Sequence, residues 1–231
     1  MKRRGAIRIG KFFLIFFLLE LIVYSVISSL HISDPTLLNT FNNERNSITS
    51  EGFLVMSFSI FKNNFTIASI EAIPVIGPFL FGISSFDTAL ILAIEGTSSG
   101  VSGFLYLLSL FLLPDTWLEI PSYAISTSIG TYFLYRLFTK RDQIRQTILK
   151  SFLLYGFVAL ELYIAASFES YEIILEKTNQ APYNLLYPLM MWIPAVPAFI
   201  FLIFLFRRID TFTGDKTTTK NEMEPNYTNG E

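Results

Sequence analysis

The sequence contains no cysteine and only one histidine, His31. Without cysteine the chain has no disulfide, no thiolate metal ligand and no thiol nucleophile. A zinc site or a serine-histidine hydrolase needs imidazole together with other side chains, and a single histidine argues against both. We therefore expect no catalytic residues, no metal and no cofactor, and we expect that the protein is not an enzyme.

Charged residues are also scarce, at 16% of the 231-residue chain, and the formal net charge is −2. Apolar residues make up 52% of the chain, which includes 24 Phe, and the mean hydropathy is +0.48. This composition does not fit a water-soluble domain of this length or a basic nucleic-acid-binding surface. A bilayer-spanning helix needs about 20 apolar residues, and the chain holds roughly six such stretches. The sequence therefore predicts an all-α, polytopic membrane helix bundle.

The predicted membrane domain covers residues 12–208. We expect some of its helices to be broken by Pro or Gly, because Pro removes a backbone donor and such breaks are tolerated where protein surrounds the helix. The polar segment 31–52 is predicted as a loop and 169–181 as an acidic link. The short apolar run 53–61 either lies on the membrane surface or leads into the second span. The six predicted spans are residues 12–30, 65–84, 86–113, 115–138, 148–168 and 185–206.

Lys and Arg gather in three regions: residues 1–11, the segment 136–150, and Arg207-Arg208 after the last span. Six spans place all three regions on one side of the membrane, and basic loops mark the cytoplasmic side. We therefore predict a multi-pass protein of the cell membrane with both termini in the cytoplasm. The tail 209–231 is rich in Thr, Asn, Lys and Glu without apolar periodicity, and it is predicted to be disordered.

Five glutamates fall inside the predicted spans. An ionised carboxylate near the bilayer midplane costs about 3 kcal/mol on insertion scales, so each needs a proton or a partner. The acids either line a polar pathway or make interhelical hydrogen bonds as neutral acids, and both interpretations remain open. We expect Glu95 near the midplane, with no Lys or Arg inside a span to pair with the acids. The five are Glu20, Glu71, Glu95, Glu119 and Glu161.

One of these acids follows a predicted hairpin between the third and fourth spans. Asp115 or Thr116 can cap the fourth helix, and Asp115 and Glu119 lie on one helical face. Capping does not explain Glu119. We expect Glu119 to tie the second, third and fourth helices together.

Two places are expected to receive the Glu119 side chain. One is the Asn63-Asn64 pair at the mouth of the second span, which is itself expected to cap that helix. The other is backbone opened around Gly96 and Gly100 in the third span. Together with Gly103, these glycines have near-helical spacing, which favours the close approach of another helix.

The order of these features resembles the stage II sporulation protein M family of integral membrane proteins. The similar segments are Ile60-Phe61-Lys62-Asn63-Asn64, then Gly77 and Gly82, then Glu95-Gly96 with Gly100, then Leu113 to Ser122, within residues 55–165. Two positions depart from the family pattern. Glu95 stands where the pattern has Asn, and Asp115-Thr116 stand where it has His-Gly.

The resemblance implies a polytopic membrane protein that, in spore formers, helps to anchor and organise cell-wall-remodelling partners during engulfment. From it we expect a non-enzymatic membrane scaffold or anchor. Its partners would be the lipid bilayer and membrane or envelope proteins, and it can also form a homo-oligomer; no nucleic acid is expected. The alternative is a transporter or permease component with an acidic intramembrane pathway.

Overall fold

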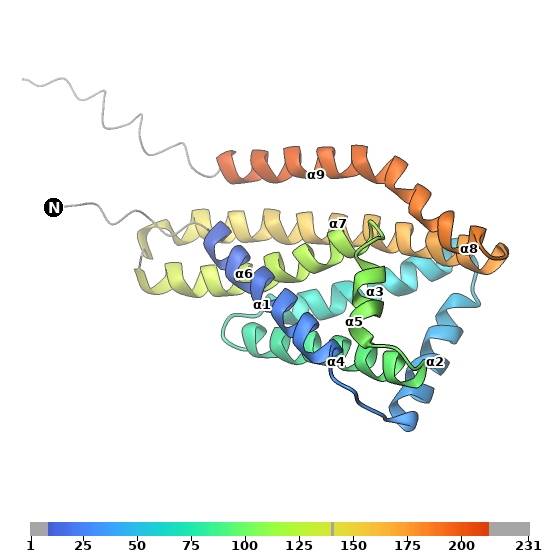
Figure 1. The fold of residues 1–231 in the computed structure, drawn as a ribbon. Helices are drawn as coiled ribbons and strands as arrows, with labels where there is room; N and C mark the ends of the chain where they lie inside the picture. The colour runs from blue at the N-terminus through green and yellow to red at the C-terminus, as the bar shows by residue number, and fades with distance from the viewer. Residues whose placement is uncertain (1–8, 140, 213–231) are drawn as a thin grey trace, which may run out of the picture.

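The computed structural model describes residues 9–139 and 141–212, and within these residues the chain is helical with no strand. The predicted all-α class is confirmed. Six long helices are joined by short turns and by three shorter helical pieces (Figure 1). The long helices are α1 (Ile9–Ser28), α3 (Phe53–Glu71), α4 (Gly77–Ser98), α6 (Thr116–Thr139), α7 (Ile144–Thr178) and α9 (Trp192–Phe212); the shorter ones are α2 (Pro35–Thr49), α5 (Gly103–Leu110) and α8 (Tyr183–Leu186), with 3₁₀ turns at Arg141–Gln143 and Pro188–Met191.

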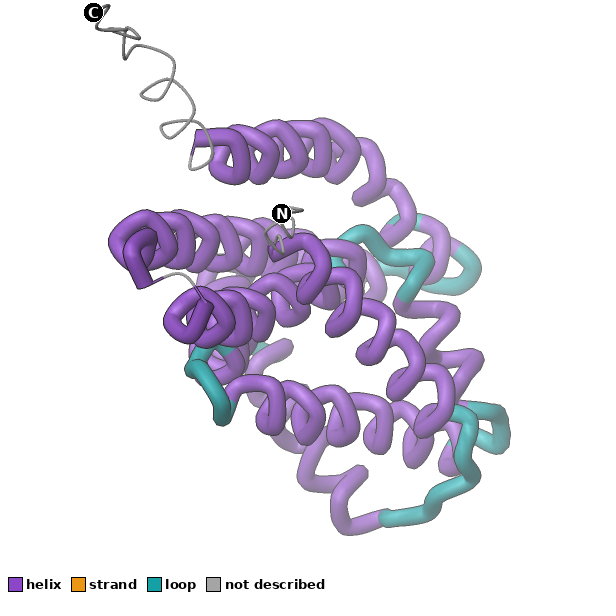
Figure 2. Tube along the Cα trace, turned by 90° about the vertical axis from the view of Figure 1, so that its left-hand side faces the viewer, coloured by secondary structure: helices purple, strands orange, loops and turns teal. Residues whose placement is uncertain are grey.

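Among the described residues, five helical segments are long and apolar enough to cross a membrane, and α6 is the long helix outside that set. α6 packs against α1, α3, α4 and α7, whereas α9 lies on the outside against α7. Figure 2 shows the separate position of α9. Much of the middle of α6 is buried, including Ser122, Ser126, Thr127 and Ser128. A helix surrounded by protein has little contact with lipid, so its surface does not need to be apolar.

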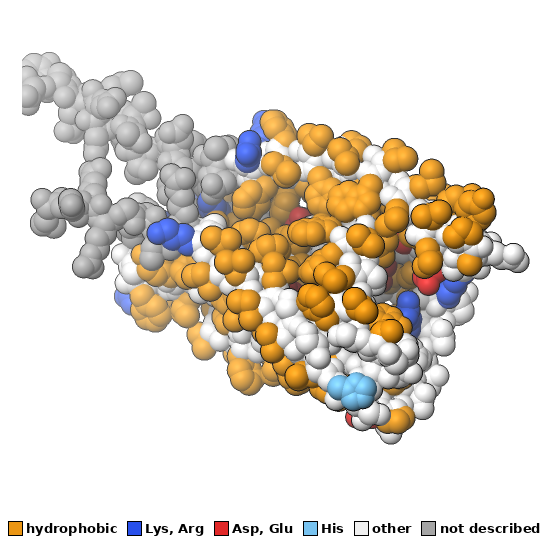
Figure 3. All heavy atoms as spheres, viewed as in Figure 1, with side chains coloured by type: hydrophobic (Ala, Val, Ile, Leu, Met, Phe, Trp, Pro, Cys, Tyr) orange, Lys and Arg blue, Asp and Glu red, His pale blue; other side chains and the backbone are white. Residues whose placement is uncertain are grey.

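The start of α1, the turn between α6 and α7, and the end of α9 lie at one end of the bundle, on the left of Figure 1. Lys and Arg side chains gather at this end in Figure 3. The described parts of the three basic regions, which are predicted to share one side of the membrane, therefore share one end of the molecule. This end is called the basic end, and the end that carries α2 and α8 is called the opposite end. Which end faces the cytoplasm stays a prediction.

Small residues let the helices approach closely. Ala68, Ala89, Ala124 and Ala165 are fully buried between helices. A Cβ atom added to Gly130 of α6 would lie 2.5 Å from the backbone oxygen of Ala72. Lipid is as apolar as the side chains, so helix association in a membrane depends on such packing and on interhelical hydrogen bonds.

The predicted second span, residues 65–84, is divided in the structure. α3 begins at Phe53 and ends at Glu71, and α4 begins at Gly77. The run 53–61 thus leads into a helix. Pro74 has no backbone donor and Val75 has φ = 74°, which a helix does not accommodate. The proline-induced break that we expected is present, and it reverses the chain.

The predicted third span, residues 86–113, is also divided. α4 ends at Ser98, Gly100 adopts φ = 73°, and α5 starts at Gly103 behind the Ser102 cap, whose hydroxyl accepts the N–H of Phe104. The positive φ is one that glycine adopts without a steric penalty. The expected continuous glycine face is therefore wrong, because these glycines build a turn between two helices.

Two segments predicted as links are helical. Residues 31–52 contain α2, whose first N–H groups bind the Asp34 carboxylate at 2.9 and 3.1 Å. Residues 169–178 continue α7, whose 35 residues extend about 52 Å, well beyond the roughly 30 Å of a bilayer core.

The predicted sixth span, residues 185–206, begins with α8 and a 3₁₀ turn; α9 then runs to Phe212. The predicted tail from residue 209 therefore starts inside α9. Its remainder, 213–231, and residues 1–8 of the basic N-terminal segment lie outside the described residues.

Candidate functional site

The start of α6 carries the two acids of the predicted hairpin. α6 begins at Thr116, directly after Asp115, whose backbone carbonyl accepts the N–H of Glu119 at 3.0 Å. Asp115 therefore occupies the capping position. Asp115 and Glu119 are one turn apart and project to one side. Their charged neighbours across the helix interface are Glu169 and Glu172 of α7.

Glu119 is bonded directly to α3. Nδ2 of Asn64 donates to Oε1 of Glu119 at 2.5 Å, and Nδ2 of Asn63 donates to Oδ1 of Asn64 at 3.3 Å. Of the two places expected to receive Glu119, the asparagine pair is the one that binds it. The pair lies in the middle of α3 and not at its start. The predicted helix-capping role of Asn63-Asn64 is therefore wrong, because α3 starts about ten residues earlier.

α7 presents a row of acids to α6. Glu161, Glu169 and Glu172 lie at helical spacing, so they share the face that packs against α6. Glu161 is 6% exposed, and its Oε2 accepts the hydroxyl of Ser122 at 2.8 Å. At this position the acid serves as an interhelical hydrogen-bond acceptor.

Asp115 and Glu172 form an unusual buried pair. They are 6% and 4% exposed, and no N–H or O–H group of the described residues donates to Oδ1 of Asp115 or to either carboxyl oxygen of Glu172. The polar group facing Glu172 is the Asp115 carboxyl itself. Two buried carboxyl groups that face each other repel when both are ionised. One of them must therefore carry a proton, or a cation must lie between them.

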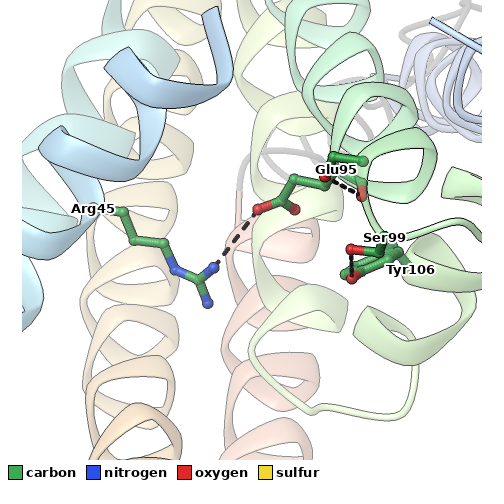
Figure 4. A network of polar contacts seen from close by, with 5 residues as sticks. Arg45, Glu95, Ser99 and Tyr106 are labelled. Carbon is green, nitrogen blue, oxygen red and sulfur yellow. Dashed lines mark hydrogen bonds and ion pairs between the residues drawn. The ribbon is translucent and has the colours of Figure 1, made fainter. Parts of the chain in front are cut away.

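Glu95 lies at the rim of this region. It is in the last turn of α4 and not near the middle of a span, because α4 ends three residues later. Its Oε1 is 3.7 Å from a guanidinium nitrogen of Arg45 on α2, and the side chains are 17% and 51% exposed. Figure 4 shows Arg45 reaching from α2 toward Glu95. The basic partner of this acid comes from outside the predicted spans, since the segment predicted as a loop contains a helix that carries Arg45.

A second contact in Figure 4 fixes the turn below Glu95, where the hydroxyl of Tyr106 on α5 donates to that of Ser99 at 2.9 Å. Gly96 lets the same turn close, because an added Cβ would lie 2.2 Å from the backbone nitrogen of Gly103. Gly96, Gly100 and Gly103 therefore build the turn that follows Glu95.

Another pair of acids lies deeper in the bundle. Glu20 of α1 and Glu71 of α3 are each 1% exposed and lie close enough to interact electrostatically. Oε1 of Glu71 accepts the hydroxyl of Ser84 on α4 at 2.5 Å, while Oε2 of both acids has no donor among the described residues. Tyr24 lies one turn after Glu20 on α1 and is also buried.

These side chains can accept hydrogen bonds and can bind protons or cations. Among residues 9–139 and 141–212, no three His, Cys, Asp or Glu side chains are arranged to hold a metal ion. His31 lies with Thr97 at the end of α4, where its Nδ1 is 3.3 Å from the Thr97 hydroxyl. It therefore belongs to the loop that leads into α2.

Sequence reasoning missed Arg45, Glu169 and Glu172. The signal for the two glutamates is present, because Glu161, Glu169 and Glu172 continue one helical face past the expected end of the span. Arg45 gives no comparable signal, since only the folded position of α2 brings it to Glu95.

Residues 12–172 match the model of a protein family described as stage II sporulation protein M. The matched region takes in α1 to α6 and α7 as far as Glu172, and thus every acid described above. No curated protein and no solved structure matches the chain. The resemblance expected from the sequence motifs is confirmed over well more than half of the chain.

Proposed function

The chain belongs to the stage II sporulation protein M family of integral membrane proteins, and we propose that it is a non-enzymatic scaffold that holds partner proteins at the cell membrane. Its partners would be membrane or envelope proteins, and a second copy of the chain is one such partner. The observation that carries this proposal is the shape of the opposite end. There α2 and the last turns of α7 form a polar structure that continues beyond the apolar part of the bundle.

Charged and amide side chains at the opposite end can form hydrogen bonds and ion pairs with another protein. A pocket of about 260 Å³ lies between α2 and α7, where Lys177 donates to the carbonyl and hydroxyl oxygens of Thr49 at 3.0 and 2.6 Å. Its polar lining also includes Asn42, Arg45, Asn46, Glu176 and Asn184.

The body of the bundle is tied together by polar bonds between helices. Besides the bonds of Glu119 and Glu161, the Ser126 hydroxyl donates to the backbone oxygen of Ala68 at 2.5 Å, and the Ser69 and Tyr155 hydroxyls are 2.6 Å apart. Such bonds have few alternative partners in lipid. They favour one fixed arrangement of α3, α6 and α7, which suits an anchor better than a carrier that must rearrange.

Site-specific photocrosslinking in cells tests this proposal. A photoreactive residue at Asn42 or Glu176 should give defined adducts with the same membrane or envelope proteins, which mass spectrometry identifies. The matched position is Phe201, which is exposed on the apolar surface of α9 and should give none of those adducts. Identical adduct patterns at all three positions would contradict a specific scaffold surface.

One observation favours the alternative, a transporter or permease component. Glu20 and Glu71 are buried at the interface of three helices, and each has an oxygen for which the described part of the chain supplies no donor. Acids in that position are typical of proton or cation pathways. Proton and sodium flux should therefore be measured with the purified protein in liposomes. Flux that is lost in Glu71→Gln but kept in Glu161→Gln would favour transport over the scaffold.

A further inference from the structure

The opposite end of the bundle carries more carboxyl groups than basic partners. Glu119 and Glu169 lie beside the Asp115–Glu172 pair, and Glu95 lies at the rim. Arg45 is the basic side chain beside Glu95 and Glu169, and Lys177 on the same stretch of α7 is bonded to Thr49. The inner pair receives a hydrogen bond from neither of them.

The shortage of basic partners matters most for the two buried acids, Asp115 and Glu172. A buried polar group without a hydrogen-bond partner is costly, and a buried charge is more so. Asp115 directly precedes α6, where its backbone carbonyl accepts the N–H of Glu119, and Glu172 comes from the facing side of α7. We propose that Asp115 and Glu172 bind a guanidinium or ammonium group that enters from the opposite end of the bundle.

The geometry favours a nitrogen cation over a metal ion. Carboxyl groups in the described part of the chain do not converge as a metal site requires. Guanidinium carries five N–H donors in a planar fork, and ammonium carries three, so each can reach acceptors that are several ångströms apart. Arg45 already places one guanidinium at the rim, where it is half-exposed.

The four acids differ in their exposure. Glu119 and Glu169 are partly exposed, whereas Asp115 and Glu172 behind them are buried. Figure 3 shows red side-chain atoms recessed among apolar ones, both along the bundle and near the opposite end. A cation that enters from this side would meet the two partly exposed acids first and then the buried pair.

This inference rests on the proposed scaffold function and gives its partner a chemical feature. A basic side chain in the membrane segment of a partner is costly in lipid, and the acids would offset that cost. A small organic cation offers the same chemistry from solution. The experiment therefore uses one probe of each kind.

The full chain is reconstituted in nanodiscs and titrated at pH 8 with N-acetylarginine amide, and separately with an apolar model helix carrying one Arg near its end. The matched helix carries Gln at that position. The fluorescence of the two tryptophans reports binding, since Trp117 lies in the first turn of α6 and Trp192 bonds the neighbouring carbonyl of Leu112. We expect saturable binding of the Arg helix, at least tenfold weaker binding of the Gln helix, and at least tenfold weaker binding of the Arg helix to Glu172→Gln or Asp115→Asn.

Glu161→Gln is the control, because Glu161 is a buried acid of the same helix whose partner is Ser122; its binding should stay within twofold of the unchanged protein. Binding of the Arg helix alone would identify the source as a partner's side chain, and binding of the amide as well would extend the site to small cations.

The inference would be overturned if neither probe bound saturably, or if Glu172→Gln and Glu161→Gln weakened binding of the Arg helix equally. The carboxyl groups would then be neutralised by protons and not by a bound cation. If the crosslinked partners persist in Glu172→Gln, the scaffold function stands while this site does not. Thermal unfolding of each variant separates loss of binding from loss of the fold.

Discussion

Three pairs of polar side chains inside this bundle each join two helices. Asn64 with Glu119 joins α3 to α6, Ser84 with Glu71 joins α4 to α3, and Ser122 with Glu161 joins α6 to α7. Of the two interpretations of the intramembrane acids, interhelical bonding describes these three contacts. The Asp115–Glu172 pair is different, since each acid faces another acid.

Glu119 allows the structural role to be tested with two substitutions. The carbonyl oxygen of Gln at this position can still accept from Asn64, so Glu119→Gln should leave stability nearly unchanged. Leu cannot accept, and Glu119→Leu should lower the free energy of unfolding by about 1 kcal/mol, the scale of an interhelical hydrogen bond in membrane proteins. Thermal unfolding in mild detergent measures both variants. Glu176→Leu, at an exposed position, is the control, and a Glu119→Leu variant as stable as that control would rule out the tie.

At the scale of the element, close backbone contacts hold α6 against its neighbours. An added Cβ at Gly130 would lie 2.5 Å from the carbonyl oxygen of Ala72, whereas one at Gly156 of α7 would meet nothing within 4 Å. Gly130→Ala should therefore destabilise the bundle by roughly 1 to 3 kcal/mol, as overpacked cores do. Gly156→Ala should be neutral or slightly stabilising, because Ala favours helix. Equal unfolding temperatures for the two variants would show that α6 does not need this contact.

The sequence predicts the helices well where length and apolar character decide, as in α1 and α9. It fails where backbone conformation decides. Pro74 indicates a break in the helix. The apolar residues on both sides of it do not indicate that Val75 adopts a positive φ and that the chain reverses there. The turn at Gly100 is hidden in the same way within an apolar stretch.

The sequence predicts those residues of the candidate site that lie within apolar stretches, and it does not predict those that lie in polar segments. Asn64, Asp115 and Glu119 stand out as polar residues in apolar surroundings, and the structure brings them to one region. Arg45 and Glu172 lie in segments whose polarity predicts loops, so their role becomes visible only once α2 and the end of α7 are helical. Polarity alone does not separate a loop from a helix that projects beyond the membrane.

At the scale of the whole molecule, the arrangement of the ends predicts the orientation in the membrane. Arg136, Arg141 and Arg145 surround the α6–α7 turn at the basic end, together with Lys11 and Arg207-Arg208. Basic residues near span ends remain in the cytoplasm during insertion. The basic end should therefore face the cytoplasm, and α2 with the end of α7 should face outward.

Reporter fusions test this orientation directly. Fusions after Asn42 in α2 and after Gln180 beyond α7 should be active for a periplasm- or exterior-specific reporter. Fusions after Gln143 in the α6–α7 turn and after Asp215 should be active for a cytoplasmic one. The structure sharpens the test, because Asn42 and Gln180 belong to one end and Gln143 to the other. Opposite signals from Asn42 and Gln180 would mean that α3, α4, α6 and α7 do not all cross the membrane, whereas a uniform reversal would keep the bundle and place the acidic pair Asp115–Glu172 on the cytoplasmic side.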